Sequence, residues 1–76
     1  MKGKLVTMYN SGKFYSYVSD RQDRGIQFYL GFGASQSASI KDLRRELLEQ
    51  ADKMIAEKEL GIEILREALA WARDGA

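Results

Sequence analysis

The chain changes character near Ser35, and this change constrains the fold more than any other feature of the sequence. The part before it contains every tyrosine and phenylalanine, whereas residues 40–73 are rich in leucine, alanine, glutamate, lysine and arginine. Aromatic residues punctuated by glycine and asparagine favour strands and turns, and the second composition favours helix. We therefore predict one domain over residues 1–76, of the α+β class, in which the strands precede the helix.

Three strands are predicted in the first part, over residues 4–9, 13–19 and 26–32. The segment Asn10-Ser11-Gly12 tolerates positive φ, so the first two strands should form a β-hairpin. A polar stretch that ends in Gly25 suits a solvated loop before the third strand. The expected sheet is antiparallel and three-stranded.

The third strand alternates between apolar and other residues, which predicts one core face. That face carries Ile26, Phe28, Leu30 and Phe32. The register of the other two strands stays open, because a slip of one residue exchanges their faces. In either register a second face rich in tyrosine remains.

Residues 33–39 form a small polar linker, and Ser39 is the best candidate for a helix N-cap because Asp42 follows three residues later. We predict one long C-terminal helix over residues 40–73, with Gly75 beyond its end. Glycine weakens a helix, so a bend at Gly61, or a break there that makes a helical hairpin, is the alternative. The apolar stripe keeps its phase through Gly61, which favours the single helix.

Such a helix would be about 51 Å long, whereas a seven-residue strand is about 23 Å long. The helix would then extend beyond its own sheet, and the extending part is apolar over more than one stripe. A second copy of the chain is the simplest cover, so we predict a homodimer through this helix. Its predicted interface residues are Leu60, Ile64, Leu65, Ala68, Leu69 and Trp71.

The chain has no cysteine and no histidine, which excludes a thiol nucleophile, a Ser-His-Asp triad and a thiolate or imidazole zinc site. Gly31 and Gly33 lack the further motif residues of phosphate-binding loops, so relief of crowding at the end of the sheet explains them better. Glu59, Glu63 and Glu67 form a row on one helix face, which is more simply a solvated surface than a metal site. We expect no catalytic residue, no cofactor and no metal.

The location of the protein is expected to be cytoplasmic. No run of 18 or more apolar residues exists to span a bilayer, and the N-terminus lacks the apolar stretch of a signal peptide. Twelve Lys and Arg against 11 Asp and Glu give a net charge of +1, which opposes a dominating attraction to nucleic acid or to a membrane.

The tyrosine-rich face is the best candidate for a contact surface, together with cations of the neighbouring loop. The predicted contact residues are Tyr15, Tyr17, Tyr29, Arg21 and Arg24. Tyrosine anchors many protein interfaces, so we expect a non-enzymatic module that binds an unidentified protein. Bases stacked on the rings would make it a single-stranded nucleic-acid-binding module instead, and a third reading is that the rings only pack on the sheet.

In size and style the chain is similar to many small accessory proteins of phages and mobile elements, which act by occupying the surface of a larger protein. This resemblance concerns no particular motif. It implies an inhibitor or adaptor and names no target.

Overall fold

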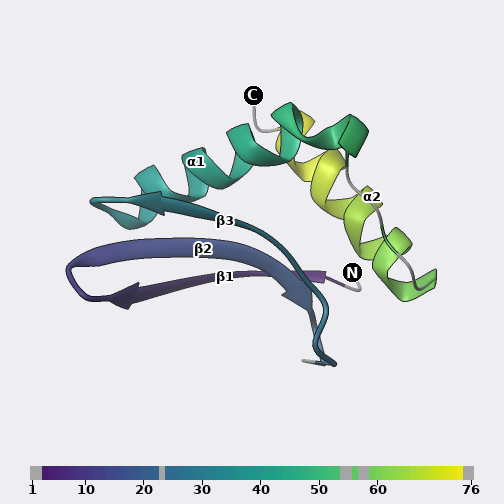
Figure 1. Cartoon of the computed structure of the whole chain (residues 1–76), viewed down its shortest axis with the longest axis horizontal. Helices are drawn as coiled ribbons and strands as arrows, with labels where there is room; N and C mark the ends of the chain where they lie inside the picture. Colours follow the sequence, from purple (N-terminus) through teal and green to yellow (C-terminus); the bar gives the residue numbers. More distant parts are fainter. Residues whose placement is uncertain (1–2, 23, 54–55, 57–58, 75–76) are drawn as a thin grey trace.

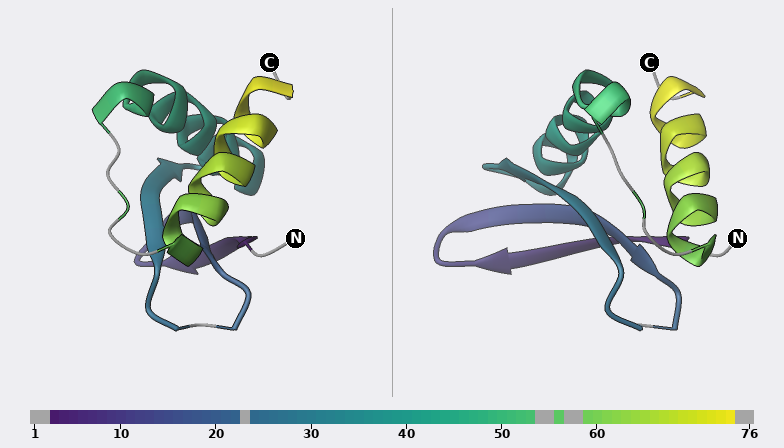
Figure 2. Two further views of the ribbon diagram at one scale, coloured as in Figure 1. Left: turned by 90° about the vertical axis from the view of Figure 1, so that its right-hand side faces the viewer. Right: turned by 45° about the vertical axis from the view of Figure 1, so that its right-hand side comes forward.

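The computed structural model describes residues 3–22, 24–53, 56 and 59–74. Three strands form an antiparallel sheet in the order β1-β2-β3, and both helices lie on the same side of it (Figures 1 and 2). The elements are β1 (Gly3–Asn10), β2 (Lys13–Asp20), β3 (Gln27–Gly33), α1 (Gln36–Glu49), a short 3₁₀ turn (Ala51–Lys53) and α2 (Glu59–Asp74). The predicted α+β class, with a three-stranded antiparallel sheet before a C-terminal helix, is confirmed.

A two-residue turn joins β1 to β2, as the sequence predicts. Ser11 and Gly12 have φ angles of 52° and 83°. Positive φ at both central residues matches the right-handed twist of the two strands. The hairpin therefore pairs without interruption, from Asn10 with Lys13 at the turn to Gly3 with Asp20 at the far end.

The pairing of β2 with β3 contains a β-bulge at Tyr29. Tyr17 pairs with Leu30 and Val18 pairs with Phe28, so Tyr29 is an extra residue on β3. Its φ of 43° is positive, which is uncommon for a residue other than glycine. One extra residue reverses the alternation of every side chain that follows.

This reversal corrects the predicted core face of β3. Ile26 and Phe28, before the bulge, pack against the core. After the bulge Gly31 lies against α1, so Leu30 and Phe32 project from the opposite side of the sheet and are exposed. The prediction that all four apolar residues share one face is wrong, because it assumed a regular strand.

The single helix over residues 40–73 is also wrong, because two helices replace it. α1 begins four residues earlier than predicted, and Ser35 is its N-cap, with its hydroxyl oxygen accepting the Ala38 N–H at 3.1 Å. Ser39, the predicted cap, is buried inside α1, and the predicted linker 33–39 contains the first turn of the helix. Residues 54–55 and 57–58 of the predicted helix lie outside the described residues, and so does Gly75, which was predicted to follow its end.

The chain turns between the helices, so α2 packs back over the sheet beside α1 (Figure 2). Gly61 is the third residue of α2, so the helix does not end there. The buried core lies between the sheet and the two helices. Its buried apolar residues are Val18, Leu43, Leu47, Ile64, Ala68 and Ala72.

This arrangement removes the reason for predicting a dimer through the C-terminal helix. Ile64 and Ala68 are buried within the single chain, and Leu60, Leu69 and Trp71 pack against the same core, while Leu65 is half-buried. The longest dimension of the fold is 35 Å, shorter than the predicted helix alone. Most of the apolar surface of α2 is therefore covered by its own sheet and by α1, whereas Ile62 is 40 % exposed.

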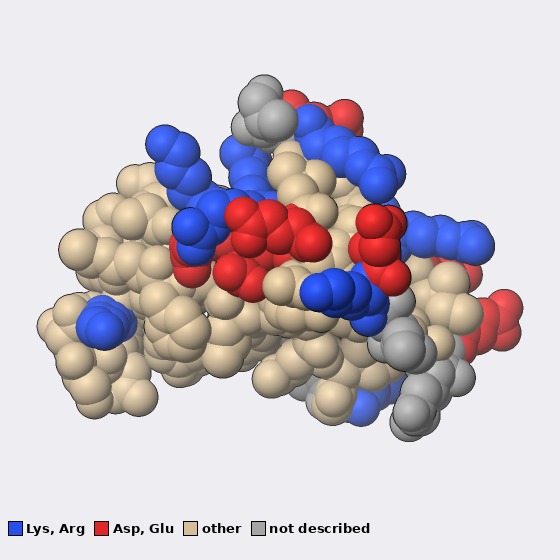
Figure 3. All heavy atoms as spheres, turned by 45° about the horizontal axis from the view of Figure 1, so that its top comes forward, with Lys and Arg blue, Asp and Glu red and all other residues tan. Residues whose placement is uncertain are grey.

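A cation also links the two helices. The guanidinium carbon of Arg44, on α1, lies 4.6 Å from the centre of the Trp71 ring, on α2. Such a contact is favourable because the ring face carries partial negative charge. Elsewhere on the helical side, acidic and basic side chains are interleaved (Figure 3). Among the described residues, neither helix is long and apolar enough to cross a bilayer.

Candidate functional site

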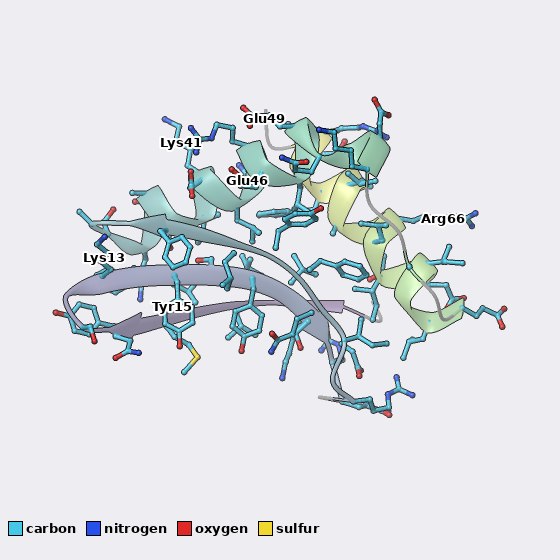
Figure 4. All side chains as sticks on the ribbon, viewed as in Figure 1. Lys13, Tyr15, Lys41, Glu46, Glu49 and Arg66 are labelled. Carbon is cyan, nitrogen blue, oxygen red and sulfur yellow. The ribbon has the colours of Figure 1, made fainter. Side chains whose placement is uncertain are left out.

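The side of the sheet that faces away from the helices carries the candidate site. The Ser16 hydroxyl lies 2.8 Å from the hydroxyl of Ser39 on α1, so Ser16 faces the helices. Its neighbours on β2, Tyr15 and Tyr17, therefore face the other way. Figure 4 shows Tyr15 on the helix-free side, whereas Lys41 and Glu49 project from the outer surface of α1.

The strand register brings apolar residues of all three strands together on this side. One row across the sheet joins Met8 to Tyr15 and Tyr15 to Phe32, and the next row joins Val6, Tyr17 and Leu30. We call this surface the open sheet face. It consists of Val6, Met8, Tyr15, Tyr17, Leu30 and Phe32.

Three of these side chains are about half exposed to solvent: Met8 at 45 %, Leu30 at 46 % and Phe32 at 52 %. An antiparallel sheet covered on one side normally presents polar residues on the other. Contiguous exposed apolar side chains instead mark interaction surfaces. The open sheet face therefore has the composition of a contact surface.

The two tyrosines of this face are held in place by each other and by Met8. Their ring centres lie 6.4 Å apart, with 16° between the ring planes. The Tyr15 hydroxyl donates to the Met8 sulfur at 3.3 Å, and the Tyr17 hydroxyl lies 4.0 Å from the same atom. Methionine sulfur is polarisable and packs well beside aromatic rings. The centre of the face is thus ordered by contacts within the chain.

Two lysines lie on the same side of the sheet as the open sheet face. By strand alternation, Lys4 and Lys13 belong to the same side of the sheet, near its two ends. Among the described residues, no carboxylate projects from this side, because Asp20 belongs to the other side and the remaining acidic residues lie on the helices or the 3₁₀ turn. A shallow hollow at the hairpin end is lined by Asn10, Ser11, Lys13, Tyr15, Leu30 and Phe32.

The five predicted contact residues do not all lie together. Tyr15 and Tyr17 belong to the open sheet face, whereas Tyr29 is the extra residue of the bulge. Arg21 and Arg24 lie in the loop after β2, at the end of the sheet away from the hairpin turn. The structure thus brings together two of the five.

Arg24 has a structural partner in this loop. Its Nε lies 3.2 Å from a carboxylate oxygen of the buried Asp20. The same carboxylate accepts the backbone N–H groups of Gln22 at 2.8 Å and of Arg24 at 2.5 Å. Burial acts to raise the pKa of Asp20, but these hydrogen bonds and the guanidinium charge outweigh it and hold the pKa below its ordinary value of 3.8. The ion pair organises the loop.

Four residues of the open sheet face were not predicted: Val6, Met8, Leu30 and Phe32. The signal for the two on β3 was the pair of glycines that alternates with them. A methyl group on Gly33 would lie 2.6 Å from the Cβ of Ala38, so only a strand without side chains there can approach α1 this closely. The interpretation that Gly31 and Gly33 relieve crowding is confirmed, and it also implies that their neighbours face outward.

In the described part of the chain, no group of three or more acidic side chains is arranged to hold a metal ion. Comparison of the chain with protein-family models, with curated proteins and with solved structures finds no match in any of the three.

Proposed function

We propose that this chain is a non-enzymatic protein-binding module of the inhibitor or adaptor type, and that the open sheet face is its contact surface. The observation that carries the proposal is the group of Met8, Leu30 and Phe32, which are each about half exposed on one side of the sheet, with the tyrosines of β2 between Met8 and the two residues of β3. Burying these side chains against a partner would remove apolar surface from water, which is favourable in proportion to the area covered.

The surroundings of the face indicate the chemistry of the partner. Lys13 places positive charge at the hairpin end of the face, and the centre of the face is apolar. Interfaces pair an apolar centre with an apolar centre, and a charged rim with a rim of opposite sign. The partner we propose is a protein surface or segment with an apolar patch flanked by aspartate or glutamate.

Single-stranded nucleic acid is the alternative, because Phe32 is exposed and the nearby charges are positive. Base stacking requires exposed aromatic ring faces. Here Val6, Met8 and Leu30 have none, and the rings of Tyr15 and Tyr17 stack on each other. The composition of the face therefore favours a protein partner.

A peptide-display library selected against the purified protein tests the proposal. We expect selected peptides to combine apolar residues with Asp or Glu and to shift the backbone amide signals of β1, β2 and β3. Leu30→Ser should weaken their binding at least about tenfold, because it removes an apolar contact. The matched control is Leu48→Ser, which changes a leucine on α1 of similar exposure, 39 % against 46 %.

Equal effects of the two leucine variants would contradict the proposal. A labelled oligothymidylate provides the second measurement. Tight binding at low salt that weakens steeply as salt is added, with loss of binding in Phe32→Ser, would replace the protein partner by nucleic acid. We expect no such binding.

A further inference from the structure

The two edges of the sheet differ in how they are protected. On the β3 edge the Phe32 N–H donates to a carboxylate oxygen of Asp42 at 2.9 Å, and the bulge at Tyr29 interrupts the strand. Bulges and side chains that occupy edge groups are devices that prevent pairing with another strand. The β1 edge has no comparable bulge, since Gly3 to Asn10 pair one to one with β2.

The hairpin turn determines which backbone groups of β1 face outward. In a hairpin with a two-residue turn, the closing pair, here Asn10 and Lys13, is hydrogen-bonded across the two strands. The pattern then alternates, so Leu5, Thr7 and Tyr9 direct their N–H and C=O groups away from β2. Within the described part of the chain, no backbone hydrogen bond from another element reaches these three residues.

Gly3 is the fourth outward-facing residue, and it already has a partner. Its N–H donates to a carboxylate oxygen of Glu67, on α2, at 2.9 Å. The available part of the edge therefore runs from Leu5 to Tyr9, with Thr7 at its centre. An open edge of this length is a template for another strand.

We propose that β1 of a second copy pairs antiparallel with this edge, about a two-fold axis at Thr7. Pairing centred on Thr7 places Leu5 opposite Tyr9 of the second copy, and every outward-facing group from Leu5 to Tyr9 then gains a partner. Pairing centred on Val6 would instead require the Gly3 N–H that Glu67 occupies. The sequence predicts a homodimer, and this interface replaces the helical one.

Side chains on the helical side of the sheet complement each other in this register. An apolar cavity of about 110 Å³ lies between β1 and α2, lined by Gly3, Lys4, Leu5, Val18, Ala68 and Trp71, with Glu67 beside it. Tyr9 is 63 % exposed in the single chain, and its ring centre lies 5.0 Å from that of Phe14, with 60° between the ring planes. In the proposed dimer, the Tyr9 ring of each copy lies opposite Leu5 of the other copy, at the mouth of the other copy's cavity. The two-fold axis makes this contact occur twice.

On the other side of the sheet, the same register places Val6 beside Met8 of the second copy. Lys4 lies opposite Asn10, so no two like charges meet across the axis. The two open sheet faces then join into one surface on a continuous sheet that contains the three strands of each copy. The dimer would therefore double the contact surface without covering it.

Sedimentation equilibrium over a range of concentrations, combined with a charge exchange, tests this interface. We expect the unmodified chain to dimerise. Leu5→Lys with Tyr9→Lys in one chain places two lysines opposite each other at each end, and should raise the dimer Kd about 100-fold or more. Leu5→Lys with Tyr9→Glu should restore dimerisation, because residues 5 and 9 are about 13 Å apart within one strand and meet only between copies.

Leu30→Lys is the matched control, since Leu30 is as exposed as Leu5, 46 % against 41 %, but lies on β3. It should leave the dimer intact. Circular dichroism shows whether each variant is folded. A folded wild-type chain that stays monomeric at all concentrations overturns the proposal. An equal dimer Kd for the variant with two lysines and the variant with lysine and glutamate at positions 5 and 9 overturns it as well.

A second test uses the absence of cysteine from the chain. Across the two-fold axis the Cα atoms of Thr7 would be about 5.5 Å apart, which is within the range of a disulfide. Thr7→Cys should therefore form a covalent dimer on mild oxidation. Leu5→Cys should not, because its two copies would be about 13 Å apart. Equal cross-linking of both variants would contradict the register.

Discussion

A methyl group on Gly31 would lie 2.2 Å from the backbone nitrogen of Leu43, so β3 and α1 meet backbone to backbone at this point. The same methyl group would lie 2.3 Å from the carbonyl oxygen of Ser39. No rotation of a side chain relieves contacts with backbone atoms. The approach of α1 to the sheet therefore depends on the absence of a side chain at residue 31.

Gly31→Ala should consequently lower the free energy of unfolding by about 3 kcal/mol or more, because the helix must move away from the sheet. Urea denaturation measures the change. Gly61→Ala is the control: its new methyl group would lie 3.3 Å from the Cβ of Ala56, and alanine is the better helix former. It should change stability by about 1 kcal/mol at most. Comparable losses in both variants would contradict the close approach at Gly31.

A chain of hydroxyl groups crosses the interface between the sheet and α1. Ser16 lies 2.9 Å from the Thr7 hydroxyl oxygen and 2.8 Å from that of Ser39, and Ser39 donates to the Gln36 carbonyl oxygen at 2.8 Å. Ser16 and Ser39 are fully buried.

Replacing Ser16 alone by alanine should cost about 1–3 kcal/mol, because the remaining hydroxyl groups lose a buried partner. Ser16→Ala combined with Ser39→Ala should cost clearly less than the sum of the single changes. A double-mutant cycle from denaturation curves measures this coupling. Strictly additive losses would show that the two hydroxyls do not interact.

The buried Asp20 should make stability depend on pH in acid. Its pKa in the folded state is below 3.8, so the folded chain binds fewer protons there than the unfolded chain. The contribution of the carboxylate is then complete above about pH 4, and is lost as the pH falls through the folded-state pKa. Stability measured by denaturation should decrease on acidification in that range.

Asp20→Asn isolates this contribution from that of the other carboxylates. The variant should be less stable than wild type at neutral pH, and the difference should shrink toward low pH as the wild-type carboxylate is protonated. Asp52→Asn, which changes an exposed residue of the 3₁₀ turn, should track wild type throughout. A constant difference between Asp20→Asn and wild type from pH 7 to pH 2 would refute the assignment.

Ser35 should act as the N-cap of α1, because its hydroxyl oxygen accepts the Ala38 N–H. Ser35→Ala should cost about 1 kcal/mol. Ser37→Ala, which changes an exposed serine in the first turn, should cost nothing or stabilise the helix slightly. Thermal unfolding followed by circular dichroism compares the two. If the Ser37 change were the more costly one, the helix would begin elsewhere.

The local patterns of the sequence predicted the elements well where neighbouring residues decide the conformation. The turn at Ser11 and Gly12, the three strands and the α+β order follow from turn chemistry and composition. The helical region was predicted as one helix, because the apolar stripe keeps its phase whether or not the helix is interrupted. Tyr15 and Tyr17 were correctly placed on one face of β2, since their spacing of two residues requires it.

The composition of the open sheet face was decided by contacts between distant segments. Alternation alone assigned Leu30 and Phe32 to the core, and the bulge at Tyr29 reversed them. That reversal brings Gly31 and Gly33 against α1, where any side chain would collide with the helix backbone. The bulge interrupts the regular pairing of β3 and allows close packing against α1. Local alternation of residues does not predict it, because the packing involves residues that are distant in the chain.

By itself, then, the sequence determined that this chain forms a hairpin, a third strand and a helical C-terminal part, because turn residues and helix propensities act over a few residues. Only the tertiary structure decided which side of β3 is buried and where the C-terminal stripe of α2 is covered. Both depend on how closely a helix approaches the sheet, which is a balance of packing and steric exclusion between residues far apart in the chain.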